Sequence, residues 1–281
     1  MAAMRERYMI SGENRLRMFE AGSNREMLST EIAGAGALCA GGGRVFCAGE
    51  DESIIWVLDA DMLTPRALFV SGPQVGDLHL SPDGERLYVL CSGADSVLML
   101  HAKDGEPQIL ARAGVNPPRM ALSSRGDILA VAGGASERVI LLDAQSLAHI
   151  ADIPMPGPVQ DVAVGRLIHA LCCSERMESL LVSDDGRGNR YVRAFGGLPG
   201  ALLLGSGEAY AAACARICRF DPDAPHRPGR VLHAPGRAGR MIALGGQLIY
   251  TDVYTHEAFA LEPAGNSVRR ICAGAGEIAA L

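Results

Sequence analysis

The sequence is poor in lysine and in net positive charge. Lys103 is the only lysine among 281 residues, and the formal net charge is −6. A pI near 5.7 does not provide the basic surface that bulk nucleic-acid binding requires. We therefore expect no nucleic-acid partner, and we interpret the preference for arginine as a coding bias, not a function.

Long apolar runs are also missing. No stretch approaches the roughly 18 apolar residues of a membrane span, and no apolar segment follows the charged residues 1–7 as it would in a signal peptide. We therefore expect a cytoplasmic protein with no membrane contact. The eight cysteines lie mostly inside apolar strand patterns, where thiols behave as small hydrophobic groups, and a reducing compartment would keep them unpaired.

Motifs of common catalytic and cofactor sites are absent as well. The chain has no phosphate-binding loop, no dinucleotide fingerprint and no nucleophile elbow. Cys214 and Cys218 share one face of an expected strand. At that spacing they would stand about 13 Å apart, too far to bind one metal ion. We expect no cofactor and no metal.

The sequence does contain a repeat with spacings of 36 to 42 residues. Its clearest copy spans 77–101 and reads DLHLSPDGERLYVLCSGADSVLMLH. An apolar run opens each copy, a glycine-type turn usually follows, and further short apolar segments complete it. The first apolar residues of the copies are Leu38, Leu78, Met120, Val162, Leu202, Ile242 and Ile278.

Four short strands per repeat is the organisation of a β-propeller blade. We predict an all-β, seven-bladed β-propeller with four-stranded antiparallel blades, and one domain over residues 1–281. The turns of the Val162 and Leu202 copies are degraded, which leaves six or eight blades as alternatives, and the Val162 copy shows no recognisable fourth strand. The predicted blades cover about 37–75, 76–118, 119–158, 159–200, 201–239, 240–276, and 277–281 plus 5–36.

The two ends of the chain share the last blade. Residues 278–281 form an inner strand with no strand after it, while residues 7–22 align with 86–104 but have no inner strand before them. We predict that the C-terminal strand pairs with the strand around Tyr8–Ile10. This pairing would close the ring and remove free sheet edges.

Residues 81–100 resemble the repeat of bacterial YVTN-type β-propellers, with Tyr88 and Val89 in the name-giving position. Residues 138–164 and 56–64 resemble further parts of that repeat, and the likeness extends loosely over nearly the whole chain. It implies a seven-bladed propeller. It is a poor guide to function, because the family includes lactonase-like enzymes, periplasmic binding proteins and proteins of no known role. The Gly-His and Trp-Asp pairs of WD repeats are absent.

The mouth of the central channel is the usual ligand site of a propeller, and residues just before the inner strands should line it. Opposite charges converge there in this sequence. They either bind a small polar ligand or fill the channel with an internal salt-bridge network. The candidate ligand-binding residues are Asp77, His79, Arg119, Gln160, Asp161, Arg240 and Glu277.

His79 differs from the other candidates because it lies inside an inner strand. The equivalent positions of the other copies carry small or apolar residues such as Cys39 and Ala121. His79 is therefore either a proton-transfer group near the channel or a core histidine bonded to a neighbouring blade.

Arginines gather between residues 216 and 240, where four prolines also indicate an extended outer strand or loop. This stretch either docks an acidic protein partner or forms an ordinary solvated edge. The candidate partner-binding residues are Arg227, Arg230 and Arg237.

These patterns favour a non-catalytic binding or scaffolding module for a protein or peptide partner, acting as a monomer. Short loops leave little material to wall a catalytic pocket. One alternative is a lactonase-like hydrolase that opens a sugar or organic-acid lactone with the charged residues of the channel mouth. Another is a structural subunit of a larger assembly. The fold alone does not separate the three.

Overall fold

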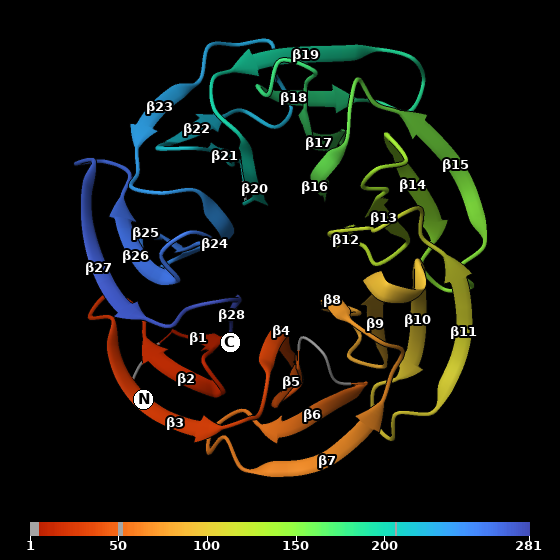
Figure 1. Ribbon diagram of the computed structural model, residues 1–281, viewed down its shortest axis with the longest axis vertical. Helices are drawn as coiled ribbons and strands as arrows, with labels where there is room; N and C mark the ends of the chain where they lie inside the picture. Colours follow the sequence, from red (N-terminus) through yellow and green to blue (C-terminus); the bar gives the residue numbers. More distant parts are fainter. Residues whose placement is uncertain (1–5, 50–52, 206) are drawn as a thin grey trace.

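Tight turns and short apolar strands build a closed ring in the computed structural model, which describes residues 6–49, 53–205 and 207–281. Seven four-stranded sheets stand around a central axis (Figure 1). Every strand pairing within the sheets is antiparallel. The predicted all-β, seven-bladed propeller is therefore confirmed. Residue 5 of the predicted closing blade lies outside the described residues.

We number the blades 1 to 6 in chain order, and the closing blade completes the ring. From blade 1 to the closing blade, the inner strands are β4 (Ala35–Gly41), β8 (Val75–Leu80), β12 (Met120–Leu122), β16 (Val159–Val164), β20 (Pro199–Leu204), β24 (Ala238–Leu244) and β28 (Ile278–Ala280). The second strands are β5 (Arg44–Gly49), β9 (Arg86–Cys91), β13 (Ile128–Ala132), β17 (Ile168–Cys173), β21 (Ala209–Ala213), β25 (Gln247–Asp252) and β1 (Arg7–Gly12).

The outer half of each blade follows the same order. The third strands are β6 (Ile54–Asp59), β10 (Ser96–His101), β14 (Arg138–Asp143), β18 (Ser179–Asp184), β22 (Arg216–Phe220), β26 (Glu257–Glu262) and β2 (Arg15–Glu20). The outer strands are β7 (Pro65–Val70), β11 (Pro107–Arg112), β15 (His149–Pro154), β19 (Arg190–Phe195), β23 (Arg230–His233), β27 (Ser267–Ala273) and β3 (Arg25–Glu31). A short 3-10 turn, η1 (Ser92–Ala94), joins β9 to β10.

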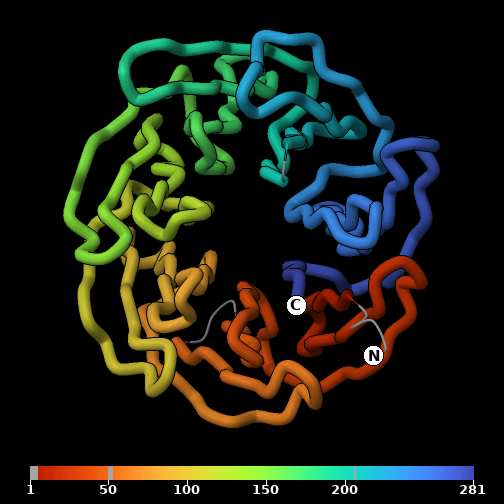
Figure 2. Tube along the Cα trace, turned by 180° about the vertical axis from the view of Figure 1, so that it is seen from behind, coloured from red at the N-terminus to blue at the C-terminus, as the bar shows by residue number. Residues whose placement is uncertain are grey.

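The ring closes as predicted, by pairing of the two chain ends. Tyr8 lies opposite Ala280, and Ile10 lies opposite Ile278. The Ser11 N–H also donates to the Glu277 carbonyl over 3.0 Å. Figure 2 shows the red N-terminal strands beside the blue C-terminal segment. The C-terminal strand thus completes the closing blade, which has four strands like the other six.

The outer strand of blade 4 is the element that the sequence did not predict. β19 covers Arg190–Phe195, and four of its six residues are exposed. Its sequence, RYVRAF, does not alternate between apolar and polar residues, which is the pattern by which strands are recognised. This strand lies on the outer rim of the ring (Figure 1) and carries Arg193.

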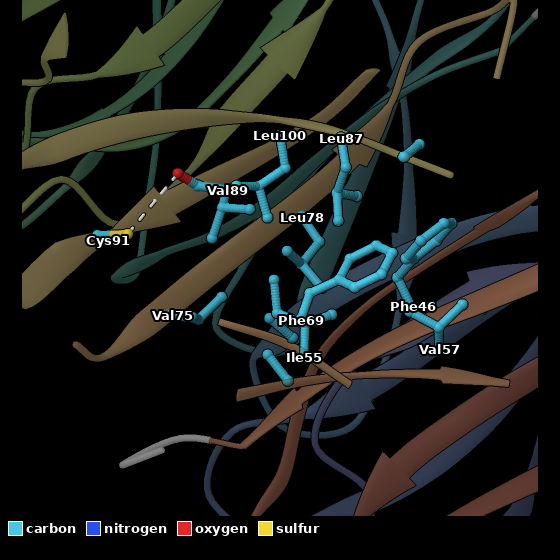
Figure 3. Close-up of a cluster of buried hydrophobic side chains, with 13 residues drawn as sticks. Phe46, Ile55, Val57, Phe69, Val75, Leu78, Leu87, Val89, Cys91 and Leu100 are labelled. Carbon is cyan, nitrogen blue, oxygen red and sulfur yellow. Dashed lines mark hydrogen bonds between the residues drawn. The ribbon is translucent and has the colours of Figure 1, made fainter. Parts of the chain in front are cut away.

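Apolar side chains between neighbouring blades form the core. Seven clusters of buried residues occupy the seven junctions. Figure 3 shows the cluster between blades 1 and 2, where the Phe46 and Phe69 rings lie 6.2 Å apart beside Leu78. The junction of blades 4 and 5 has the smallest cluster, with five buried residues against seven to thirteen at the others. This junction is therefore the least completely filled by apolar side chains.

Candidate functional site

A backbone irregularity aims the candidate residues at the channel. The pairing register shifts in five inner strands, for example between Val75 and Asp77 and between Val159 and Asp161. An extra residue in one strand bends it and re-aims its side chains. Asp77 and Asp161 consequently occupy equivalent places in blades 2 and 4, and both carboxylates are buried.

Four charged side chains from four blades meet at the channel axis. The Arg240 guanidinium pairs with Asp77, and its Nε lies 2.5 Å from Glu277 Oε2. Arg119 binds the second oxygen of Glu277 over 2.9 Å and also donates to the Gly76 carbonyl over 2.9 Å. These contacts join blades 2, 3 and 6 to the closing blade. The four residues are called the channel network below.

The two aspartates also fasten neighbouring blades to each other. Asp77 accepts the N–H of Leu78 and, from blade 3, the N–H of Met120, each over 3.0 Å. Asp161 repeats the pattern with the N–H of Val162 over 2.8 Å and the N–H of Leu202 in blade 5 over 2.7 Å. Each carboxylate thus satisfies two backbone donors that burial would otherwise leave without partners.

The electrostatics of the two carboxylates differ. Burial opposes the ionised form of Asp77, but Arg240, His79 and Arg119 outweigh it and hold the pKa of this carboxyl well below its usual range. Burial raises the pKa of Asp161 despite Arg240 and two backbone donors. For Arg240, the three carboxylates around it outweigh burial and raise its pKa. The arginine is therefore permanently charged.

The remaining channel candidates lie at the edge of this arrangement. His79 places Nε2 3.6 Å from Asp77 Oδ2, and this nitrogen is buried without a hydrogen-bond partner. Gln160 is exposed and joins neither the channel network nor Asp161. The structure therefore brings Asp77, Arg119, Arg240 and Glu277 together, sets Asp161 and His79 beside them, and leaves Gln160 apart.

Two cavities lie along the channel on either side of the network. One of about 740 Å³ is lined by His79, Asp161 and Arg240 and by apolar residues that include Met120 and Leu202. The other, of about 530 Å³, is lined by Arg119, Glu277 and mainly glycine and alanine. Both volumes suit a small ligand. Residues of the network border both cavities, with Arg240 at the first and Arg119 and Glu277 at the second.

The three candidate partner-binding arginines diverge. Arg237 lies in the β23–β24 connection and stacks 5.0 Å over Tyr254, whereas Arg227 lies in the β22–β23 connection at the other end of β23 and pairs with Asp221 at 3.7 Å. Arg230 lies opposite Arg219 and reaches the Ala264 carbonyl of blade 6. The structure does not bring these three residues into one surface.

A different group of cations meets on the outer rim, between β19 of blade 4 and β22–β23 of blade 5 (Figure 1). Arg193 and Arg216 line a groove of about 430 Å³ there with His226. We call it the rim groove. Its lining is Arg193, Ala194, Phe195, Arg216, Cys218, His226, Pro228, Gly229 and Val231. Recognition of β19 as a strand would have revealed Arg193, because strand alternation then predicts which face it shares.

Within the described residues, no cluster of three or more His, Cys, Asp or Glu side chains has the arrangement of a metal site. In the same residues, no helix is long and apolar enough to cross a membrane.

Comparison with known proteins identifies the fold but no family. No family model matches the sequence. No curated protein matches it either. The chain is similar to a functionally unknown protein from Desulfotomaculum acetoxidans DSM 771, with a TM-score of 0.80, 10% identity and 98% coverage of both chains.

Two further solved structures share the fold. The WD40 domain of Neurospora crassa Pan2 has a TM-score of 0.66 at 12% identity, over 85% of this chain and 78% of that one. Kuenenia stuttgartiensis hydrazine synthase has a TM-score of 0.69 at 14% identity, over 83% and 77%. These likenesses show the fold alone, and the similar structures differ in their printed descriptions, from a WD40 domain to a hydrazine synthase. The YVTN family remains a prediction.

Proposed function

We propose that this propeller is a non-catalytic binding module for a protein or peptide partner. One observation carries the proposal: the charged groups of the channel already bind one another. Arg240 and Arg119 pair with Asp77 and Glu277, while Asp161 accepts two backbone N–H groups. General acid–base catalysis needs a group that can exchange a proton with the substrate. Breaking this network to free one would expose buried, unpaired charge, which is costly.

A hydrolase is the second candidate, because one feature favours it. Asp161 lines the cavity of about 740 Å³ together with His79 and Arg240, and burial raises its pKa. A carboxyl with a raised pKa in a cavity of that size is the arrangement of a general acid. The substrate would be a small lactone, with Arg240 as the carbonyl clamp.

Two assays separate the candidates. Selection of binders from a random dodecapeptide display library should enrich peptides that bind the folded protein, and an unrelated propeller should not capture them. A panel of sugar and aliphatic lactones should show no turnover above background. Turnover of one lactone at ordinary enzymatic rates, lost in Asp161→Ala, would establish the hydrolase instead. A library that yields no binder would overturn the binding module.

A further inference from the structure

The rim groove has an electrostatic character opposite to that of the whole chain. The chain has a formal net charge of −6, yet residues 187–240 contain nine arginines against three carboxylates. Of these three, Glu208 pairs with Arg219 on the face of blade 5 that looks toward blade 6, and Asp221 pairs with Arg227. Neither carboxylate lines the groove, and neither does the third, Asp223. The groove is therefore a local cationic site on an acidic protein.

The cations of the groove are differently engaged. Arg193 donates to the Pro225 carbonyl over 2.8 Å and to the Arg227 carbonyl. These acceptors are neutral, so the arginine keeps its full charge while it fixes the 221–229 loop. Arg216 is exposed, and across residues 6–49, 53–205 and 207–281 its side chain has neither a hydrogen bond nor an ion pair. The groove thus holds one anchored cation and one that is free to bind.

The remaining lining is apolar and follows the strands. Phe195 comes from β19 and Val231 from β23, and Val231 is 53% exposed. Tyr191 of β19 is 46% exposed and lies against His226, with 5.5 Å between the rings. Side chains of an extended peptide alternate between two directions. Arg193 and Phe195 share one face of β19, and Arg216 and Val231 share one face of blade 5. Each wall of the groove therefore presents an arginine beside an apolar side chain, and a segment between the walls can turn an acidic and an apolar residue, two positions apart, toward each wall.

From this combination we infer that the rim groove binds an extended acidic peptide segment of a partner protein, in which acidic and apolar residues stand two positions apart. The inference rests on the proposed function and adds the site and the chemistry of the partner. Charge complementarity identifies an acidic occupant, and the exposed side chain of Val231 offers an apolar contact on the same face as Arg216. The outer strand of blade 5, β23, has four residues, Arg230–His233. Four residues of strand span about 13 Å, so a peptide segment that runs along β23 contacts it over about this length.

The test uses a fluorescent dodecapeptide with Glu-Glu-Val-Val-Glu-Glu at its six central positions, flanked by glycine and serine. Fluorescence anisotropy should show saturable binding to the full chain, weakened at least about tenfold when glutamine replaces glutamate or in 0.5 M salt. Arg216→Glu should abolish the preference for glutamate, and Arg216→Gln should reduce it.

Arg230→Glu is the matched control, since it changes the charge equally in the same blade but lies on the face toward blade 6. It should leave binding within about twofold of the wild type. Equal affinity for the glutamate and glutamine peptides, or an equal loss in both charge-reversal variants, overturns the inference. If the random library still yields binders in that case, the binding function stands and only the site assignment fails. If the library yields none, both fail.

Discussion

At the scale of single residues, the buried aspartates accept hydrogen bonds from the neighbouring blade or from their own, and the buried His169 is neutral. Asp77 and Asp161 accept backbone donors from the next blade, whereas His169 stays uncharged inside the blade 4–5 junction. His169 bonds Ser183 over 2.8 Å and packs edge-on against Phe220, with Nε2 unpaired. Burial lowers the pKa of His169 to about 4.

His169 should make stability depend on pH. Between its ordinary pKa of 6.5 and its folded pKa of about 4, the unfolded chain binds a proton that the folded protein does not. The free energy of unfolding should therefore fall as the pH drops from 7 to 4, by up to about 3 kcal/mol from this group. His169→Gln should flatten this part of the pH profile in denaturant titrations, and exposed His233→Gln should not. Parallel profiles for wild type and His169→Gln would contradict the assigned environment.

Asp161→Ala should lower the free energy of unfolding by about 2 kcal/mol, because two buried N–H groups lose their acceptor. Asp161→Asn keeps one acceptor oxygen and should lose less. Asp223→Ala, an exposed change in the lining of the same cavity, should have little effect. Chemical denaturation measures all three. If Asp161→Ala is as stable as the wild type, Asp161 does not fasten blade 4 to blade 5.

At the scale of elements, β28 is the strand whose loss should matter most. Ile278 is buried in the cluster between blade 6 and the closing blade, and only three residues pair with β1. Deletion of residues 278–281 should lower the free energy of unfolding by about 3 kcal/mol, in the range of large core truncations. Leu281→Ala is the control, because it keeps the backbone N–H that donates to the Arg7 carbonyl over 2.9 Å. An unchanged melting temperature in the longer deletion would mean that closure does not depend on this strand.

Elements with strong apolar patterns could be predicted from the sequence, and those without could not. The pairing of residues 278–281 with the strand around Tyr8–Ile10 followed from the repeat, because the last inner strand needed a partner, whereas the register of Ile278 opposite Ile10 came from the structure. β19 was missed because its exposed residues carry no apolar period. That omission concealed the rim groove, since Arg193 lies on this strand.

The candidate site was predictable only as a set of charges. Repeat alignment placed Asp77, Arg119, Arg240 and Glu277 near one axis, where the structure joins them. Repeat alignment did not show whether these charges bind a small polar ligand or form an internal salt-bridge network, because that depends on the distances between them. Arg227, Arg230 and Arg237 are neighbours in sequence, but strand direction and alternation send them to different places.

At the scale of the whole molecule, we assign different roles to the charged residues of the channel and to those of the rim groove. The channel network and the hydrogen bonds of Asp161 join blades at the centre of the ring. These charged groups therefore stabilise the contacts between blades. On the outer rim at the junction of blades 4 and 5, the Arg216 side chain has no partner within the described residues, and this is the surface that we propose for a partner. Binding should therefore leave the centre of the ring unchanged.

Hydrogen–deuterium exchange of the full chain, with and without a saturating concentration of the tightest dodecapeptide from the display selection, tests this separation most directly. We predict slower exchange of the backbone amides in Arg190–Phe195 and in residues 216–231, with no change in β8, β16 and β24 at the channel. Slower exchange confined to those inner strands would contradict it, because it would place the partner in the channel and not on the rim.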